Sequence, residues 1–125
     1  MDVFGSDYPT PVVTCLRDYI HVSDLISAHM DALAHLRKGG ESGIFNCGYG
    51  KGYSVLEVIE AVGKAAGKPV NHNLVPRRAG DLAGIVAGAD RVRDILGWEP
   101  KYADLDLIVR SALDWEMHLA RRNAA

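Results

Sequence analysis

Two arginines and an aspartate are the residues of this chain with the clearest chemical potential. Arg17 lies in the run Arg17-Asp-Tyr-Ile-His-Val22, and Arg78 and Asp81 lie in Pro76-Arg-Arg-Ala-Gly-Asp81. A guanidinium group can donate two parallel hydrogen bonds to a phosphate, and a carboxylate can accept hydrogen bonds from ribose hydroxyls. This combination of residue types indicates a local anion site that would suit a nucleotide.

Each arginine could instead have a purely structural role, and the residues alone do not decide between that role and anion binding. Arg17 could pair internally with Asp18 or Asp24, and Arg77 and Arg78 could form a solvated surface pair. The net charge of -2 provides no broad basic field, so we expect neither nucleic acid nor an anionic membrane as a partner. Any anion would have to be bound locally.

The segment Gly48-x-Gly50-x-Gly52 is a second candidate, because glycine-rich loops before helices can cradle phosphate with their backbone N–H groups. The third glycine of a dinucleotide fingerprint would fall at Tyr53, however, and no acidic residue ends the following strand about 20 residues later. The pattern therefore favours a tight turn that needs positive φ over an NAD site.

Histidines and cysteines show no catalytic or metal-binding spacing. His21, His29 and His35 have no carboxylate pair at ligand spacing, and Cys15 and Cys47 form no CxxC motif. We interpret all five as ordinary structural residues, and Trp98 and Trp115 as core or interface aromatics. The cysteine usage and the absence of a signal-peptide or membrane-spanning pattern predict a cytoplasmic protein.

The elements that must position these residues form a mixed α/β order in one domain, residues 1–125. We expect strands at 15–22, 43–47 and 70–75. We expect about four helices: one capped by Ser23 and stopped by Gly39-Gly40, one with a capping box at Ser54 that ends at Gly67, one from Asp90 to Gly97, and one from Asp104 through Leu119.

Five blocks carry a resemblance to a known family. They are Phe4-Gly-x-Asp-Tyr-Pro-Thr-Pro11, Thr14-Cys-x-Arg-Asp-Tyr-Ile-His-Val-x-Asp-Leu25, Phe45-Asn-x-Gly-x-Gly-x-Gly-Tyr-Ser-Val55, Pro76-Arg-Arg-x-Gly-Asp81 and Leu96-Gly-Trp98. In this order they resemble the C-terminal part of the UDP-glucose 4-epimerases, which are extended short-chain dehydrogenase/reductases. The resemblance implies a small mixed α/β substrate-binding domain that lacks the N-terminal Rossmann domain.

The resemblance also implies roles in holding a UDP-sugar. Arg17 and Arg78 would bind the diphosphate, Asp81 would accept from the ribose, and Ile85 would affect the room for substituents of the sugar. The remaining implied contacts are Asp2, Val3 and Phe4 to uracil, Tyr19 in the same pocket as Arg17, and Val55 near the nucleotide.

In the family, a tyrosine of a Tyr-x-x-x-Lys motif removes the 4-hydroxyl proton while NAD takes hydride from C4. No tyrosine of this chain is followed by lysine at that spacing. We therefore expect NAD to belong to the full-length family and not to bind this chain alone. We also expect no catalytic residue here and no activity without a Rossmann domain or a partner chain that supplies one.

The loop before Arg17 departs from the family pattern. Val12-Val13 stands where the family usually has an Asp-Gly turn, and β-branched residues resist the positive φ of such a turn. A bare apolar face built to cover a Rossmann domain would favour self-association into a homo-oligomer.

Two other functions stay open. One is a non-catalytic nucleotide-sugar binding module. The other is a fragment of a UDP-glucuronate decarboxylase or 4,6-dehydratase, and the sequence Asp18-Tyr-Ile-His21 argues against this second alternative.

Overall fold

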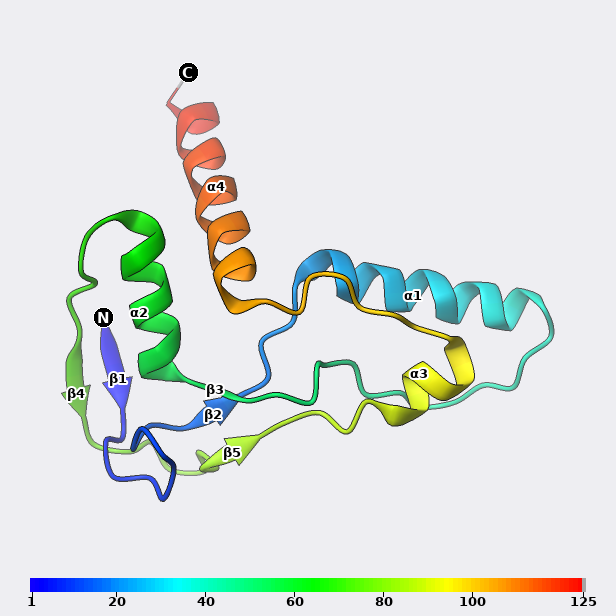
Figure 1. Cartoon of the computed structure of the whole chain (residues 1–125), viewed down its shortest axis with the longest axis horizontal. Helices are drawn as coiled ribbons and strands as arrows, with labels where there is room; N and C mark the ends of the chain where they lie inside the picture. The colour runs from blue at the N-terminus through cyan, green and yellow to red at the C-terminus, as the bar shows by residue number, and fades with distance from the viewer. Residues whose placement is uncertain (125) are drawn as a thin grey trace.

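The computed structural model describes residues 1–124 and shows two groups of elements joined by a small central sheet. Strands β1 (Asp2–Phe4) and β4 (Asn73–Val75) lie with helix α2 (Val55–Ala66) at one end (Figure 1). Helices α1 (Val22–Arg37) and α3 (Asp90–Leu96) lie at the other end. Helix α4 (Leu105–Asn123) packs against α2. The mixed α/β class and the four helices agree with the sequence-based prediction.

Short strands place the candidate anion-binding residues side by side. Strands β1 and β4 pair in parallel, with Phe4 opposite Val75. In the second sheet, β2 (Leu16–Arg17) lies between β3 (Tyr53–Ser54) and β5 (Gly84–Ile85). Strand β2 runs antiparallel to β3 and parallel to β5, so that Arg17 is opposite Ile85.

The predicted strand at 15–22 is shortened to Leu16–Arg17 because the chain beyond Arg17 is held by side chains. Asp18 accepts hydrogen bonds from backbone amides of other segments, and the amide of His21 donates to Tyr49 Oη at 3.0 Å. These contacts replace the strand ladder. The prediction of Ser23 as N-cap was also wrong, because His21 caps α1 by accepting from the Ser23 amide at 3.1 Å.

The other helix ends follow the sequence closely. Ser54 and Glu57 form the predicted capping box of α2, and Gly67 ends that helix in the left-handed region at φ 68°. Asp104 caps α4 through the Leu107 amide, and that helix continues past the predicted end to Asn123. Asp90 is the first residue of α3 and not its cap, because Ala89 occupies the capping position without a side-chain hydrogen bond.

The main apolar cluster lies between α1 and α3. Trp98 is 1% exposed there and packs with the buried residues Ala28, Ala89 and Val92. The indole Nε1 of Trp98 donates to the backbone oxygen of Asp24 at 3.0 Å, so the aromatic ring is buried without losing its polar partner. By contrast, Trp115 is 55% exposed on α4. No helix within residues 1–124 is long and apolar enough to cross a membrane.

The predicted strand at 43–47 is absent because no described strand lies beside it. Phe45 packs against the Trp98 cluster, whereas Ile44 is 85% exposed. The segment 43–47 therefore forms no strand and has no ladder partner within residues 1–124. Strand β4 covers only the second half of the predicted strand at 70–75, where β1 supplies its partner.

Val13 adopts a backbone conformation that its side chain disfavours. Its φ is 53°, the only positive value among the described non-glycine residues. A β-branched residue in this region costs about 1–2 kcal/mol, and Val13 is 46% exposed, so little burial would be lost on truncation. We expect Val13→Gly to raise the free energy of unfolding by about 1 kcal/mol, measured by urea denaturation.

Val12→Gly is the matched control for this prediction. Val12 precedes the strained residue and does not have positive φ, so its replacement should lower stability because glycine adds freedom to the unfolded chain. Equal effects of the two substitutions would show that strain at Val13 is not the cause.

Candidate functional site

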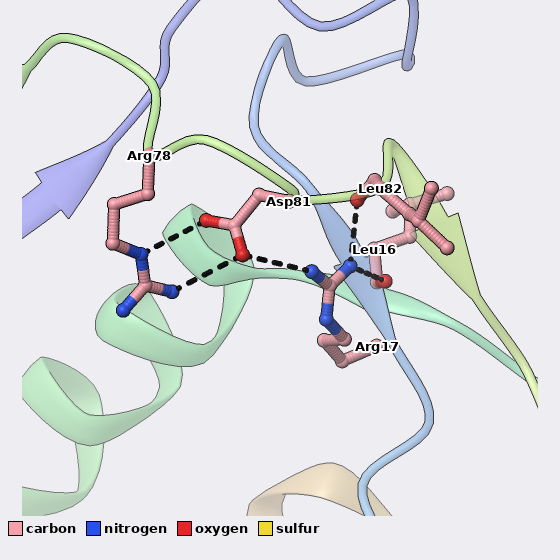
Figure 2. A network of polar contacts seen from close by, with 5 residues as sticks. All are labelled: Leu16, Arg17, Arg78, Asp81 and Leu82. Carbon is pink, nitrogen blue, oxygen red and sulfur yellow. Dashed lines mark hydrogen bonds and ion pairs between the residues drawn. The ribbon is translucent and has the colours of Figure 1, made fainter.

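The side chains of Arg17, Arg78 and Asp81 meet in one network, in which the carboxylate lies between the two guanidinium groups (Figure 2). Arg78 Nε donates to Asp81 Oδ2 at 3.0 Å, and Arg17 Nη2 is 3.9 Å from Asp81 Oδ1. Two positive groups share one negative group, which leaves one positive charge in excess. The structure therefore brings together the three residues on which the predicted anion site depends.

Arg17 is held in this position by backbone oxygens. Its Nη1 donates to the carbonyl of Leu16 at 2.7 Å and to that of Leu82 at 3.0 Å. The alternative in which Arg17 pairs with Asp18 or Asp24 is not what the structure shows, because Asp81 is the carboxylate that pairs with Arg17. The side chain is 27% exposed, whereas that of Arg78 is 60% exposed. Arg17 is thus the more sheltered and better oriented cation.

The neighbouring arginines 77 and 78 have separate contacts. Arg77 Nε donates to the Asp7 carboxylate at 2.6 Å, and its guanidinium lies 4.1 Å from the ring centre of Tyr8. The guanidinium of Arg78 lies 4.6 Å from the ring centre of Phe4. Arg77 therefore holds the loop after β1, and Arg78 is the arginine of this pair that contacts Asp81.

Strand β1 presents a free backbone edge beside Arg78. Gly5 N donates to Val75 O at 2.8 Å, and Met1 O accepts from Asn73 N at 2.9 Å, so the odd-numbered positions face β4. By the alternation of a parallel ladder, the amide groups of Asp2 and Phe4 face the other edge, where no described strand lies. The Val3 side chain is 1% exposed and packs inside.

A hollow of about 380 Å³ adjoins Arg17. Its lining includes Ile85, which lies opposite Arg17 in the β2–β5 register, but neither Arg78 nor Asp81. The full lining is Arg17, Asp18, Asn46, Cys47, Ile85, Val86, Ala87 and Gly88. Sequence reasoning missed Asn46 and Cys47 here. Val55 lies at the start of α2. The amide of Val55 donates to Cys15 O at 3.3 Å, so Val55 is next to Cys15, the residue that precedes β2.

The glycine loop donates backbone hydrogen bonds to a carboxylate of the chain itself. The amides of Tyr49 and Gly50 donate to the Asp18 carboxylate at 3.0 and 2.9 Å. Gly50 has the positive φ expected of a tight turn, 74°. Because these amides already bind a carboxylate, they are not available to a pyrophosphate, and the loop does not fit NAD.

The two tyrosines around Arg17 and the glycine loop are poor proton acceptors. Burial, followed by the hydrogen bond to Asp24, raises the pKa of Tyr49 to about 12. Burial, followed by the neighbouring Cys15 thiol, also raises the pKa of Tyr19, and the charge of Arg17 opposes this only in part. Both hydroxyls stay protonated at neutral pH. Within residues 1–124, no cluster of three or more His, Cys, Asp and Glu side chains could hold a metal ion.

Comparison with known proteins places the chain in a family, although no protein-family model matches it. A UDP-glucose 4-epimerase of Azospirillum brasilense is 56% identical over 117 residues, which are 94% of this chain and 34% of that enzyme. One from Halalkalibacterium halodurans is 50% identical over 113 residues, or 90% of this chain and 34% of the enzyme. The chain thus spans about a third of the length of these relatives.

Solved structures agree with this placement. The UDP-glucose 4-epimerase of Stenotrophomonas maltophila, determined with NAD and formylated UDP-arabinopyranose, is 43% identical with a TM-score of 0.92 over 98% of this chain and 36% of that chain. The fold is therefore that of the C-terminal part of nucleotide-sugar epimerases. The chain belongs to the UDP-glucose 4-epimerase family and corresponds to its C-terminal part.

Proposed function

We propose that this chain forms the UDP-sugar-binding portion of a UDP-glucose 4-epimerase, an enzyme that interconverts UDP-glucose and UDP-galactose. The observation that carries the proposal is the Arg17–Asp81–Arg78 network with its excess positive charge. A diphosphate that is sheltered from water needs several fixed donors, and two guanidinium groups supply them. A further support is the 56% identity to an enzyme of that name.

The nucleoside would lie on the β1 side of the two arginines. Asp81 would exchange part of its bonding to Arg17 and Arg78 for hydrogen bonds from the ribose hydroxyls. The free backbone groups of Asp2 and Phe4 would pair with the uracil edge, and the Phe4 ring would contact its face. Val3 would contribute by fixing the register of this strand and not by its buried side chain.

The sugar would then extend into the hollow on β5. That hollow contains Arg17 but not Arg78 or Asp81, so it suits the group attached at the opposite end of the diphosphate. Ile85 would limit the room there for sugar substituents. Tyr19 and Val55 would act from the surrounding wall, near Arg17 and at the start of α2 respectively.

NAD, which is bound in the Stenotrophomonas enzyme, supplies hydride transfer at C4 in the family reaction. The amides of the glycine loop already bind Asp18, so this loop does not support cofactor binding. The pKa values of Tyr19 and Tyr49 are raised, so these hydroxyls do not support proton removal. We propose that a Rossmann domain outside these residues provides both.

The chain alone should therefore be inactive. Incubation of the chain with NAD and UDP-galactose should form no UDP-glucose. Chromatography of the sugar nucleotides would measure this. A relative of full length serves as the positive control. Turnover by the purified 125-residue chain would contradict the proposal that a separate Rossmann domain supplies cofactor binding and proton removal.

Helix α1 offers the surface for the proposed NAD-binding domain. Its exposed apolar side chains recur at helical spacing and are uncovered in this structure; they are Val22, Ile26, Met30, Leu33 and Leu36. A bare stripe of this kind favours self-association when its partner is absent. Sedimentation should thus show the isolated chain forming oligomers as its concentration rises, and a monomer at all concentrations would oppose this assignment.

Isothermal titration calorimetry with UDP tests the proposed binding directly. The chain should bind UDP and should bind uridine far more weakly, because uridine lacks the diphosphate held by the arginines. An absence of UDP binding by the folded chain, verified by circular dichroism, would refute the proposed function.

A further inference from the structure

We propose that Asp18 is a positioning residue that fixes the hollow beside Arg17 at the width required by the sugar, an inference that rests on the proposed UDP-sugar function. Asp18 is half-buried and lies between the glycine loop and the segment after β5, and it is not itself assigned a contact with the nucleotide. Its role would be to hold the two walls of the hollow together through backbone hydrogen bonds.

The contacts of the Asp18 carboxylate are all with backbone amides. Oδ1 accepts from Tyr49 N at 3.0 Å, and Oδ2 accepts from Gly50 N at 2.9 Å and from Ala87 N at 3.2 Å. No described basic side chain forms an ion pair with it. The carboxylate therefore joins the glycine loop to the segment that follows β5.

The hydrogen bonds of Asp18 to the glycine loop and to Ala87 control the shape of the hollow, because they join its two walls. Asp18 directly follows Arg17, and Ala87 comes shortly after Ile85 on the opposite wall; both Asp18 and Ala87 line the hollow. Gly48 permits the close approach, since a Cβ there would lie 2.5 Å from Ala87 Cβ and 2.6 Å from Asp18 Oδ2. The separation of the two walls is thus set at these residues.

Only a carboxylate satisfies this arrangement. It presents acceptors on both oxygens, whereas an asparagine would turn an NH₂ group toward an amide donor and leave that donor without a partner. The arginines do not depend on Asp18 in the same way, because Arg17 is anchored by the carbonyls of Leu16 and Leu82. Loss of Asp18 should therefore affect the sugar more than the UDP.

The test is calorimetry of the chain with UDP and with UDP-glucose. The unaltered chain should bind UDP-glucose more tightly than UDP. In Asp18→Asn the Kd for UDP should change less than threefold, whereas the advantage of UDP-glucose over UDP should fall about tenfold or vanish. Asp94→Asn, which changes an exposed carboxylate of α3 with no hydrogen bond within residues 1–124, should retain the full advantage.

Circular dichroism melting separates positioning from folding. A purely structural Asp18 would lower Tm but leave the ratio of the two Kd values unchanged in the folded protein, and that result would overturn the inference. Gly48→Ala provides a second variant if Asp18→Asn does not fold, because its methyl group would push Asp18 and Ala87 apart; it should lower the same ratio. Equal affinities of the unaltered chain for the two ligands would also overturn the inference while leaving UDP binding intact. Failure to bind UDP at all would overturn the proposed function as well.

Discussion

Replacing Asp24 with asparagine should lower the free energy of unfolding by about 3 kcal/mol, because the buried carboxylate joins three distant parts of the chain. Asp24 is 2% exposed. Its oxygens accept from Tyr49 Oη at 2.6 Å, Tyr102 N at 2.8 Å and Lys101 N at 2.9 Å. An asparagine can replace one acceptor but would present an NH₂ group to at least one of these donors, and urea denaturation at pH 7 would measure the loss.

The same carboxylate makes stability depend on pH. Burial alone would raise the pKa of Asp24, but the hydrogen bonds from Lys101, Tyr49 and Tyr102, with the charge of His21, hold it below its ordinary value of 3.8. A lowered folded-state pKa stabilises the protein above the unfolded-state value, and this contribution is lost as the pH falls from about 3.8 through the folded-state pKa. Asp24→Asn should therefore lose less stability than the unaltered chain between pH 5 and about pH 2.

Asp31→Asn is the control for the Asp24 experiments. Asp31 lies on the same helix, and its carboxylate has no hydrogen-bond partner within residues 1–124. Its replacement should change stability by less than about 0.5 kcal/mol. A comparably small effect of Asp24→Asn would show that the buried network contributes little to folding.

Replacing Arg17 with alanine should weaken UDP binding about 100-fold. Arg17 is 27% exposed and oriented by two carbonyls, so it reaches a bound diphosphate with little loss of side-chain entropy. A charge-assisted contact of this kind contributes about 1.5–3 kcal/mol, and each 1.4 kcal/mol is tenfold in affinity. Calorimetry with UDP measures the effect.

Arg17→Lys and Arg78→Ala refine the prediction. The lysine keeps the charge but not the planar fork, so it should recover only part of the affinity. Arg78 is 60% exposed and should contribute less than Arg17. The exposed Arg37 at the end of α1 is the control, and Arg37→Ala should leave the affinity unchanged. Equal losses in the Arg17 and Arg37 variants would indicate general electrostatic attraction and not a diphosphate site.

Local signals predicted helix ends and the grouping of charged residues. The capping box of Ser54 and Glu57, the left-handed Gly67 and the cap at Asp104 depend only on neighbouring residues, and all three predictions were confirmed. The meeting of Arg17 with Arg78 and Asp81 also agrees with prediction, because their residue types indicated an anion site and the family resemblance assigned both arginines to one diphosphate. Their types alone left a surface pair equally open.

Features that depend on distant segments were not predictable in the same way. Asp18 and Asp24 look alike in the sequence, yet Asp18 is half-buried and accepts from backbone amides alone, whereas Asp24 is buried and also accepts from the Tyr49 hydroxyl. Only the folded chain brings their donors near. The strand expected at 43–47 failed for a related reason, because hydrophobic pattern cannot supply a ladder partner. An acidic residue within a predicted strand, together with a glycine loop elsewhere, is the signal that could have suggested the hydrogen bonds between Asp18 and that loop.

The pairing of remote strands has a consequence for the order in which the molecule folds. Arg17 reaches its anchor at Leu82 across 65 positions of the chain, and Asp2 contacts Asn73 across 71. Closing such long loops costs entropy before any contact compensates for it. Helices α1 and α2 can form early during synthesis, whereas the Arg17–Asp81–Arg78 network can form only after β4 and the segment up to β5 have emerged from the ribosome. Refolding of the site should accordingly lag behind the appearance of helical structure.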